Sequence, residues 1–271
     1  ICSDDCLARA VVALGTCIGR SRSRSLQRWA MRYFEPAVRA VLETTSPRAW
    51  GLAILGIQEY MRRLHGDRMA ATARATLLAR LLEQQRRSAS PRWPWFEDIV
   101  AYENARPCQA LISGGRWTGD ATMVDEGLRM LEWLATLQVS STGRFSPVGC
   151  KGFLQRGGMA AAFDQQPIEA QSMIAACIEA FHATARPEWI DRAWHAFDWF
   201  RGHNVLGVAL CDPHTGGCRD GLLEDRANEN QGAESTLAWL AALADMTALQ
   251  TGFSVPPSAG GRGRRDAAPC S

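Results

Sequence analysis

The sequence lacks several features that would indicate particular classes of protein. Lys151 is the only lysine among 30 basic residues, and 28 acidic residues leave a net charge of +2. Because a nucleic-acid groove or a membrane-binding surface needs clustered positive charge, this balance argues against both. No apolar run approaches the roughly 18 to 20 residues of a membrane span. No signal-peptide pattern precedes the first predicted helix, and the chain begins with Ile1, so we expect a piece of a longer protein.

The sequence also lacks the usual motifs of redox, metal and nucleotide chemistry. It has nine cysteines but no C-x-x-C pair, and several cysteines lie in apolar helical runs, which predicts free thiols in a reducing cytoplasm. Cys211, His214 and Cys218 have a spacing that could hold zinc, although the segment between them is also typical of a tight turn. No G-x-S-x-G elbow or phosphate-binding loop in its proper context is present. We therefore expect no metal and no cofactor.

The features that are present are almost all helical. Apolar residues recur three and four positions apart, and strand-like segments occur only at 145–154 and 205–211. One class of helix begins with an acid- or amide-rich motif and is apolar nearly all round: 7–18, 49–64, 98–112, 167–183 and 233–249. A second class is amphipathic with one charged face: 24–43, 67–88, 121–138 and 188–202.

The two classes alternate along the chain, which predicts an all-α ring of helical hairpins with inner and outer helices, an (α/α)6 toroid. Five inner and four outer helices fall short of the 12 that six hairpins need, so we expect a toroid that is incomplete at its amino terminus. Residues 1–252 would form this single domain. Residues 253–271 are rich in Gly, Pro and Arg and predict a disordered tail.

In such a ring the starts of the inner helices gather around one funnel. We expect an acidic funnel, balanced by arginines on the outer helices. Carboxylates and amides bind hydroxyl groups, and aromatic rings stack on sugar C–H faces, so this funnel predicts a sugar site. Two facing carboxyls could cleave a glycosidic bond as general acid and base. The predicted catalytic acids are Glu97, Asp98, Asp164 and Glu229. The predicted substrate-binding residues are Asp5, Arg48, Trp95, Tyr102, Asn104, Gln165, Gln166, Glu169, Asn230, Gln231 and Glu234. For any single acid, helix capping is about as good an explanation.

Several motifs in order resemble a known family. They are 93–98 (WPWFED), 102–106 (YENAR), 145–149 (FSPVG), 163–169 (FDQQPIE), 216–221 (GGCRDG) and 228–236 (NENQGAEST). Together they are similar to a bacterial (α/α)6-toroid domain of the six-hairpin glycosidase-like group, often found with group 1 glycosyltransferases. The chain departs from that pattern at Asp4 to Arg9, at Glu103 and at Pro107-Cys108.

This resemblance implies a carbohydrate-active toroid, with an oligosaccharide or sugar as partner and a glycosyltransferase domain in the same or a neighbouring chain. Three functions stay open: cleavage or transfer of a glycosidic linkage, glycan binding without catalysis, and sugar epimerisation. Epimerisation is the least favoured, because it generally uses histidines and none lies at an expected inner-helix start.

Overall fold

The structure is a computed structural model that describes residues 3–252, and the predicted tail at 253–271 lies outside this range. The described residues form nine helices and one two-stranded sheet. The helices are α1 (Asp4–Arg20), α2 (Arg24–Leu42), α3 (Pro47–Met61), α4 (Arg68–Ser88), α5 (Ala105–Thr118), α6 (Ala121–Leu137), α7 (Pro167–Thr184), α8 (Glu188–Phe200) and α9 (Ala233–Gln250). The strands β1 (Ile99–Val100) and β2 (Leu154–Gln155) are antiparallel.

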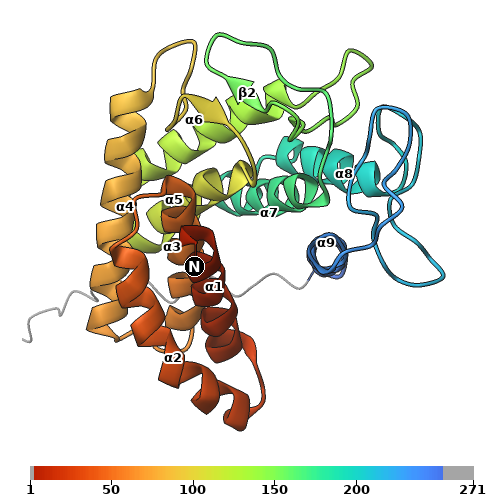
Figure 1. Ribbon diagram of the computed structural model, residues 1–271. Coiled ribbons are helices and arrows are strands. Elements are labelled where there is room, and N and C mark those ends of the chain that lie inside the picture. Colours follow the sequence, from red (N-terminus) through yellow and green to blue (C-terminus); the bar gives the residue numbers. More distant parts are fainter. Residues whose placement is uncertain (1–2, 253–271) are drawn as a thin grey trace, which may run out of the picture.

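The predicted alternation of inner and outer helices is confirmed. Helices α1, α3, α5, α7 and α9 pack side by side in that order, and α2, α4, α6 and α8 each pack on the inner helix that precedes them (Figure 1). Large side chains, among them Trp95, Trp189 and Trp199, fill the apolar core that includes both layers. The fold is therefore the predicted α/α toroid, present as an arc of four hairpins and a fifth inner helix.

Short polar side chains begin most of the helices. Ser3, Ser46 and Asp67 each accept a hydrogen bond from a backbone N–H in the first turn of α1, α3 and α4, respectively. Asp120 does the same for α6. Because the first four N–H groups of a helix have no partner within it, each of these caps satisfies one and fixes where the helix begins.

Helices α1 and α3 approach each other more closely than side chains would allow. A Cβ atom added to Gly15 would lie 2.0 Å from the carbonyl oxygen of Gly56, and one on Gly19 would lie 2.0 Å from that of Glu59. Glycine at these positions lets the two backbones touch, and this pair has the most extensive contact between helices in the described chain.

The predicted start of the third inner helix is wrong. The helix was expected over 98–112, but α5 begins only at Ala105, and Ile99 and Val100 form β1 instead. Trp93 and Trp95 donate their indole N–H groups to backbone carbonyls four residues ahead, which holds this segment in an irregular path. The strand-like segment 145–154 supplies part of β2, and Cys211 of 205–211 forms only an isolated bridge with Cys218.

Helix α9 ends the arc with one side uncovered. Leu237 is 64% exposed and Leu240 46% exposed, although α9 carries only two acids and no basic residue. Among the described helices, none combines the length and the apolar character that crossing a bilayer requires.

Candidate functional site

The amino-terminal ends of four inner helices meet in one polar region. Arg9 of α1 contacts Glu103, just before α5, with Nη2–Oε2 at 2.6 Å. Arg48 of α3 contacts Asn104 Oδ1 at 3.4 Å, and Glu169 of α7 accepts a hydrogen bond from the Asn104 side chain. We call this region the mouth, and it comprises Asp5, Arg9, Arg48, Glu97, Tyr102, Glu103, Asn104, Arg106 and Glu169.

Glu103 is the residue around which the mouth is built. Its carboxylate is buried between two guanidinium groups, Arg9 at 2.6 Å and Arg106 Nε at 3.0 Å, and Arg9 also pairs with Asp5 at 2.7 Å. Burial disfavours the charge on Arg9, but Glu103 and Asp5 outweigh it and raise the pKa of the guanidinium. The backbone of Glu103 has φ of +49°, a conformation that non-glycine residues rarely adopt. Glu103 is thus a buried ionic anchor between α1 and α5.

Glu169 holds the start of α5 from the side of α7. Its carboxyl group accepts hydrogen bonds from the backbone N–H groups of Glu103 and Asn104, and from Asn104 Nδ2 at 2.9 Å. The side chain is only 3% exposed. Burial raises its pKa to about 7, although the hydrogen bonds from Asn104 and Glu103 act in the opposite direction.

Arg48 joins the start of α3 to the segments on both sides of β1. It pairs with the carboxylate of Glu97 and donates Nε–H to the carbonyl oxygen of Tyr102 at 2.9 Å. Its guanidinium group also lies over the rings of Phe96 and Tyr102, at 5.5 and 5.3 Å from their centroids. Burial, followed by the charge of Asp5, raises the pKa of Tyr102. The Glu97 side chain is 23% exposed, so this carboxylate reaches solvent from a fixed position.

The other predicted catalytic acids lie in different surroundings. Asp98 is 82% exposed and pairs with Arg156 Nε at 2.7 Å on the outside of the β1–β2 loops. Asp164 is 22% exposed and lies 3.4 Å from Lys151 Nζ, and its buried Oδ1 makes no hydrogen bond. Glu229 is exposed. Glu97 and Asp164 are therefore the two predicted acids that are both partly buried and open to solvent.

The polar segment before α9 forms hydrogen bonds with the loop that follows α8. The Asn230 side chain donates to Asp220, and Gln231 Nε2 lies 3.3 Å from Asp212 Oδ2. Asp220 also accepts from the N–H of Gly232 at 2.6 Å, which caps α9 in place of a local side chain. Hydrogen bonds from His214 N–H and Gln231 lower the pKa of Asp212 to about 2.

Five of the predicted sugar contacts are buried: Arg48, Trp95, Asn104, Gln165 and Glu169. Trp95 is fully buried and donates Nε1–H to the carbonyl oxygen of Ile99, so it offers no face for a sugar ring. Gln165 is 1% exposed: its Nε2 donates to Ser146 Oγ and Ala162 O, and its Oε1 accepts from Trp199 Nε1 at 2.9 Å. Its neighbour Gln166 precedes α7 without a capping hydrogen bond from its side chain. Glu234 is exposed in the first turn of α9, where its charge helps to raise the pKa of Arg9.

The mouth contains residues that the sequence interpretation missed. Arg9, Glu103 and Arg106 were not among the predicted site residues, and apart from Arg48 the arginines that balance the acidic funnel were expected on outer helices. The structure instead places three arginines, Arg9, Arg48 and Arg106, on inner helices. Two of these ion pairs could have been predicted from sequence. Asp5 and Arg9 are four residues apart, and Glu103 and Arg106 are three apart, which are the spacings of ion pairs along a helix.

No metal site is evident among residues 3–252, where no group of three or more His, Cys, Asp and Glu side chains could hold an ion. Cys211 and Cys218 are free thiols on facing backbone segments, and His214 donates its N–H to Asp212 in the turn between them.

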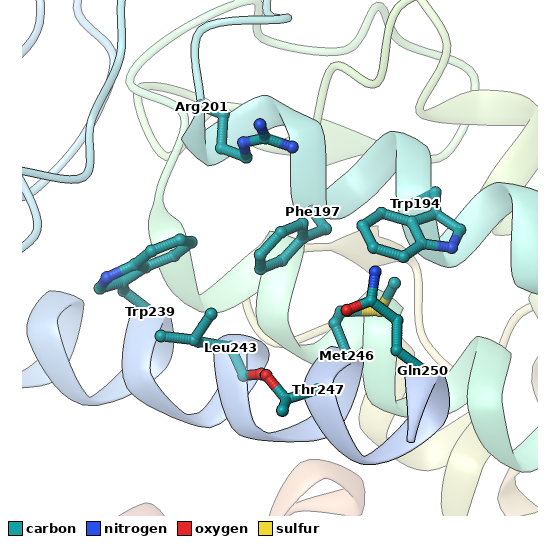
Figure 2. A pocket seen from close by; sticks show the side chains of 8 residues that line it. All are labelled: Trp194, Phe197, Arg201, Trp239, Leu243, Met246, Thr247 and Gln250. Atoms are coloured by element: carbon teal, nitrogen blue, oxygen red, sulfur yellow. The ribbon is translucent and has the colours of Figure 1, made fainter. Parts of the chain in front are cut away.

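A separate cavity of about 300 Å³ lies between α8 and α9, away from the mouth (Figure 2). Figure 2 shows Trp194 and Phe197 from α8 facing Trp239, Leu243 and Met246 from α9. Because no carboxylate lines this cavity, it lacks the groups that acid–base cleavage of a glycoside needs. The mouth is therefore the better candidate for chemistry.

Comparisons with known proteins bear on the fold. The sequence matches no protein-family model and no curated protein. Several solved structures are similar in fold. An unsaturated glucuronyl hydrolase specific for heparin shares 13% identity, with a TM-score of 0.62 over 89% of this chain and 67% of its own. A GH76 α-mannanase from Bacteroides thetaiotaomicron shares 10% identity, with a TM-score of 0.66 over 90% and 69%. The Lin0763 protein from Listeria innocua shares 11% identity, with a TM-score of 0.60 over 91% and 85%. At these identities the likeness shows the fold, which is the α/α toroid found in those two hydrolases.

Proposed function

We propose that this chain is the larger part of a carbohydrate-active toroid that binds a glycan at the mouth and hydrolyses a glycosidic bond. The observation that carries the proposal is the similar environment of two acids, Glu97 in the mouth and Asp164, which lies outside it in the loop after β2. Each carboxyl group is partly buried, lies beside a cation and reaches solvent, Glu97 at Arg48 and Asp164 at Lys151. Hydrolysis of a glycoside needs two such carboxyl groups, one to protonate the leaving oxygen and one to activate water or attack the sugar.

The two acids lie on loops that the β-sheet holds together. Glu97 precedes β1, Asp164 follows β2, and the pairing of Val100 with Leu154 fixes one loop on the other. At the mouth, the Glu103 and Glu169 contacts hold the starts of α1, α5 and α7 together. Acid–base catalysis requires carboxyl groups that are held in place, and the ion pairs of Glu97 with Arg48 and of Asp164 with Lys151 hold these two acids. The fold that this chain shares with two glycoside hydrolases supports the same proposal.

The test is cleavage of a panel of oligosaccharides, including mannans and uronic-acid-containing chains, by the parent and by single amide variants. Glu97→Gln and Asp164→Asn should each lower kcat by about 10²–10⁴-fold, the usual contribution of an acid–base group. Asp98→Asn and Glu229→Gln should stay close to the parent, because those carboxylates are exposed to solvent.

Glu83→Gln on the outer face of α4 is the matched control, because it removes an exposed carboxylate that pairs only with Arg87. An active parent whose rate survives both Glu97→Gln and Asp164→Asn would refute this assignment of the acids.

A second candidate is a glycan-binding domain without catalysis, acting beside a glycosyltransferase in the same or a neighbouring chain. It is favoured by the full engagement of Glu103 and Glu169, which leaves fewer reactive carboxyls at the mouth than the helix starts predicted. In that case glycans bind, Glu97→Gln weakens binding, and no product forms with any glycan. We also propose a cytoplasmic location, where thiols such as the seven cysteines of the described residues stay reduced.

A further inference from the structure

Helix α2 carries an exposed stripe of large apolar side chains. Leu26, Trp29 and Tyr33 are 40%, 50% and 52% exposed, and their spacing of three and four residues places them on one side of the helix. The rings of Trp29 and Tyr33 are 5.3 Å apart. A different face of α2, which includes Ala30, Phe34 and Val38, packs on the core. The stripe is thus apolar surface that the fold does not use.

A row of arginines occupies another exposed side of α2. Arg24, Arg28 and Arg32 recur every four residues and are exposed, and Arg22 precedes them in the turn before α2. Within residues 3–252 none of these four arginines forms an ion pair, whereas Arg39 at the other end of the helix pairs with Glu35. Residues 20–39 contain six arginines and one acid, Glu35. The net charge of +2 therefore conceals a strongly basic segment.

Trp and Tyr beside Arg are the residues that anchor proteins at the boundary between lipid headgroups and acyl chains. Aromatic rings prefer the interface, and the aliphatic stem of Arg can lie along apolar surface while its guanidinium group binds phosphate. A helix with a basic face and an apolar face lies flat on an anionic bilayer. In Figure 1, α2 lies at the lower edge of the molecule, where a planar surface can reach it.

We propose that α2 is a docking surface for an anionic phospholipid membrane, with Trp29 and Tyr33 entering the headgroup region and Arg22, Arg24, Arg28 and Arg32 contacting lipid phosphates. The charge of the segment selects this occupant over an apolar protein helix. An apolar helix would cover Leu26, Trp29 and Tyr33, but it would leave the four unpaired arginines without a counter-charge.

The test is cosedimentation of the whole chain with vesicles of phosphatidylglycerol and, in parallel, of phosphatidylcholine. The protein should bind phosphatidylglycerol vesicles at low salt and lose binding as salt rises, because screening weakens attraction between exposed charges. The triple variant Arg24→Gln, Arg28→Gln, Arg32→Gln should bind about 100-fold more weakly, from about 1 kcal/mol for each arginine. Trp29→Ala with Tyr33→Ala should also weaken binding, and this loss should persist at high salt.

The matched control is Arg68→Gln, Arg86→Gln, Arg87→Gln on α4, which removes the same charge from exposed positions of another outer helix. Retained binding in this control, with loss in the α2 variant, supports the proposal. All the substituted side chains are exposed, and circular dichroism checks that each variant is folded.

Three results would overturn the proposal: no binding to phosphatidylglycerol at low salt, equal loss in both arginine triples, or association of the chain with itself through Trp29 and Tyr33 in place of vesicle binding.

Discussion

The two ends of the arc of inner helices differ in how closely they are packed. At one end, α1 and α3 touch through their backbones, and Gly15 faces the carbonyl oxygen of Gly56. At the other end, α9 packs on α7 but leaves Leu237 and Leu240 exposed. Both α3 and α9 have the apolar, weakly charged sequence expected of inner helices. Two helices of similar sequence therefore differ in burial, because α3 has more helices packed around it than α9 has.

The substitution expected to disrupt the α1–α3 contact most is Gly15→Ala. The new methyl group would lie 2.0 Å from the Gly56 carbonyl oxygen, so α1 and α3 must separate along their contact. We expect a loss of about 3 kcal/mol or more in the free energy of unfolding, measured by urea denaturation. Gly66→Ala is the control, since a Cβ there meets nothing within 4 Å, and it should change stability by less than about 0.5 kcal/mol. Equal stability of the two variants would show that the helices do not touch in this way.

A pH series tests the buried carboxyl group of Glu169, which connects the start of α7 to the segment just before α5. The pKa of Glu169 is about 7 in the folded protein, against an ordinary value of 4.5, so the folded state binds its proton more tightly than the unfolded state. The free energy of unfolding should therefore fall as pH rises from about 4.5 to 7, by up to about 3 kcal/mol from this group. Urea denaturation across that range should show this slope in the parent and its loss in Glu169→Gln. The exposed control Glu83→Gln should keep it, and a slope unchanged in Glu169→Gln would contradict the buried carboxyl.

The smallest effect is expected at the open end. Asp220→Asn weakens the acceptor for the Gly232 N–H and the Asn230 amide, which together position the start of α9. We expect a loss of about 1 kcal/mol, confined to α9, because charge-assisted hydrogen bonds at partly exposed positions contribute about this much. Hydrogen exchange should become faster in α9 and stay unchanged in α1 and α3. Asp225→Asn, in the same loop but paired only with Arg226, is the control. Faster exchange in all inner helices would mean that α9 does not open separately.

The helices themselves were largely predictable from sequence. The 3.6-residue period and the caps Ser46, Asp67 and Asp120 are local features, and they gave the nine helices and their inner and outer classes. The start of α5 was not predictable in this way. The period continues back to Asp98, but two features override it: the indole hydrogen bonds to carbonyls four residues ahead, and the pairing of Val100 in β1 with Leu154 in β2, far along the chain.

The mouth was predicted less well than the fold. Sequence pattern places acids and amides near helix starts but does not show which way they point. Trp95 and Gln165 lie in the core because of partners far along the chain, Trp133 and Trp199. Glu103 was overlooked because its role depends on Arg9, 94 residues away.

The order α1, α3, α5, α7, α9 makes the inner layer a linear array, in which each helix packs on its neighbours in the layer and on an adjoining outer helix. In such an array cooperativity passes from neighbour to neighbour, and of the two described end helices α9 has far less contact with the rest than α1, whose backbone touches α3. Thermal fluctuations should therefore open the chain from α9 inward, and the α1–α3 pair should be the last part to lose its structure.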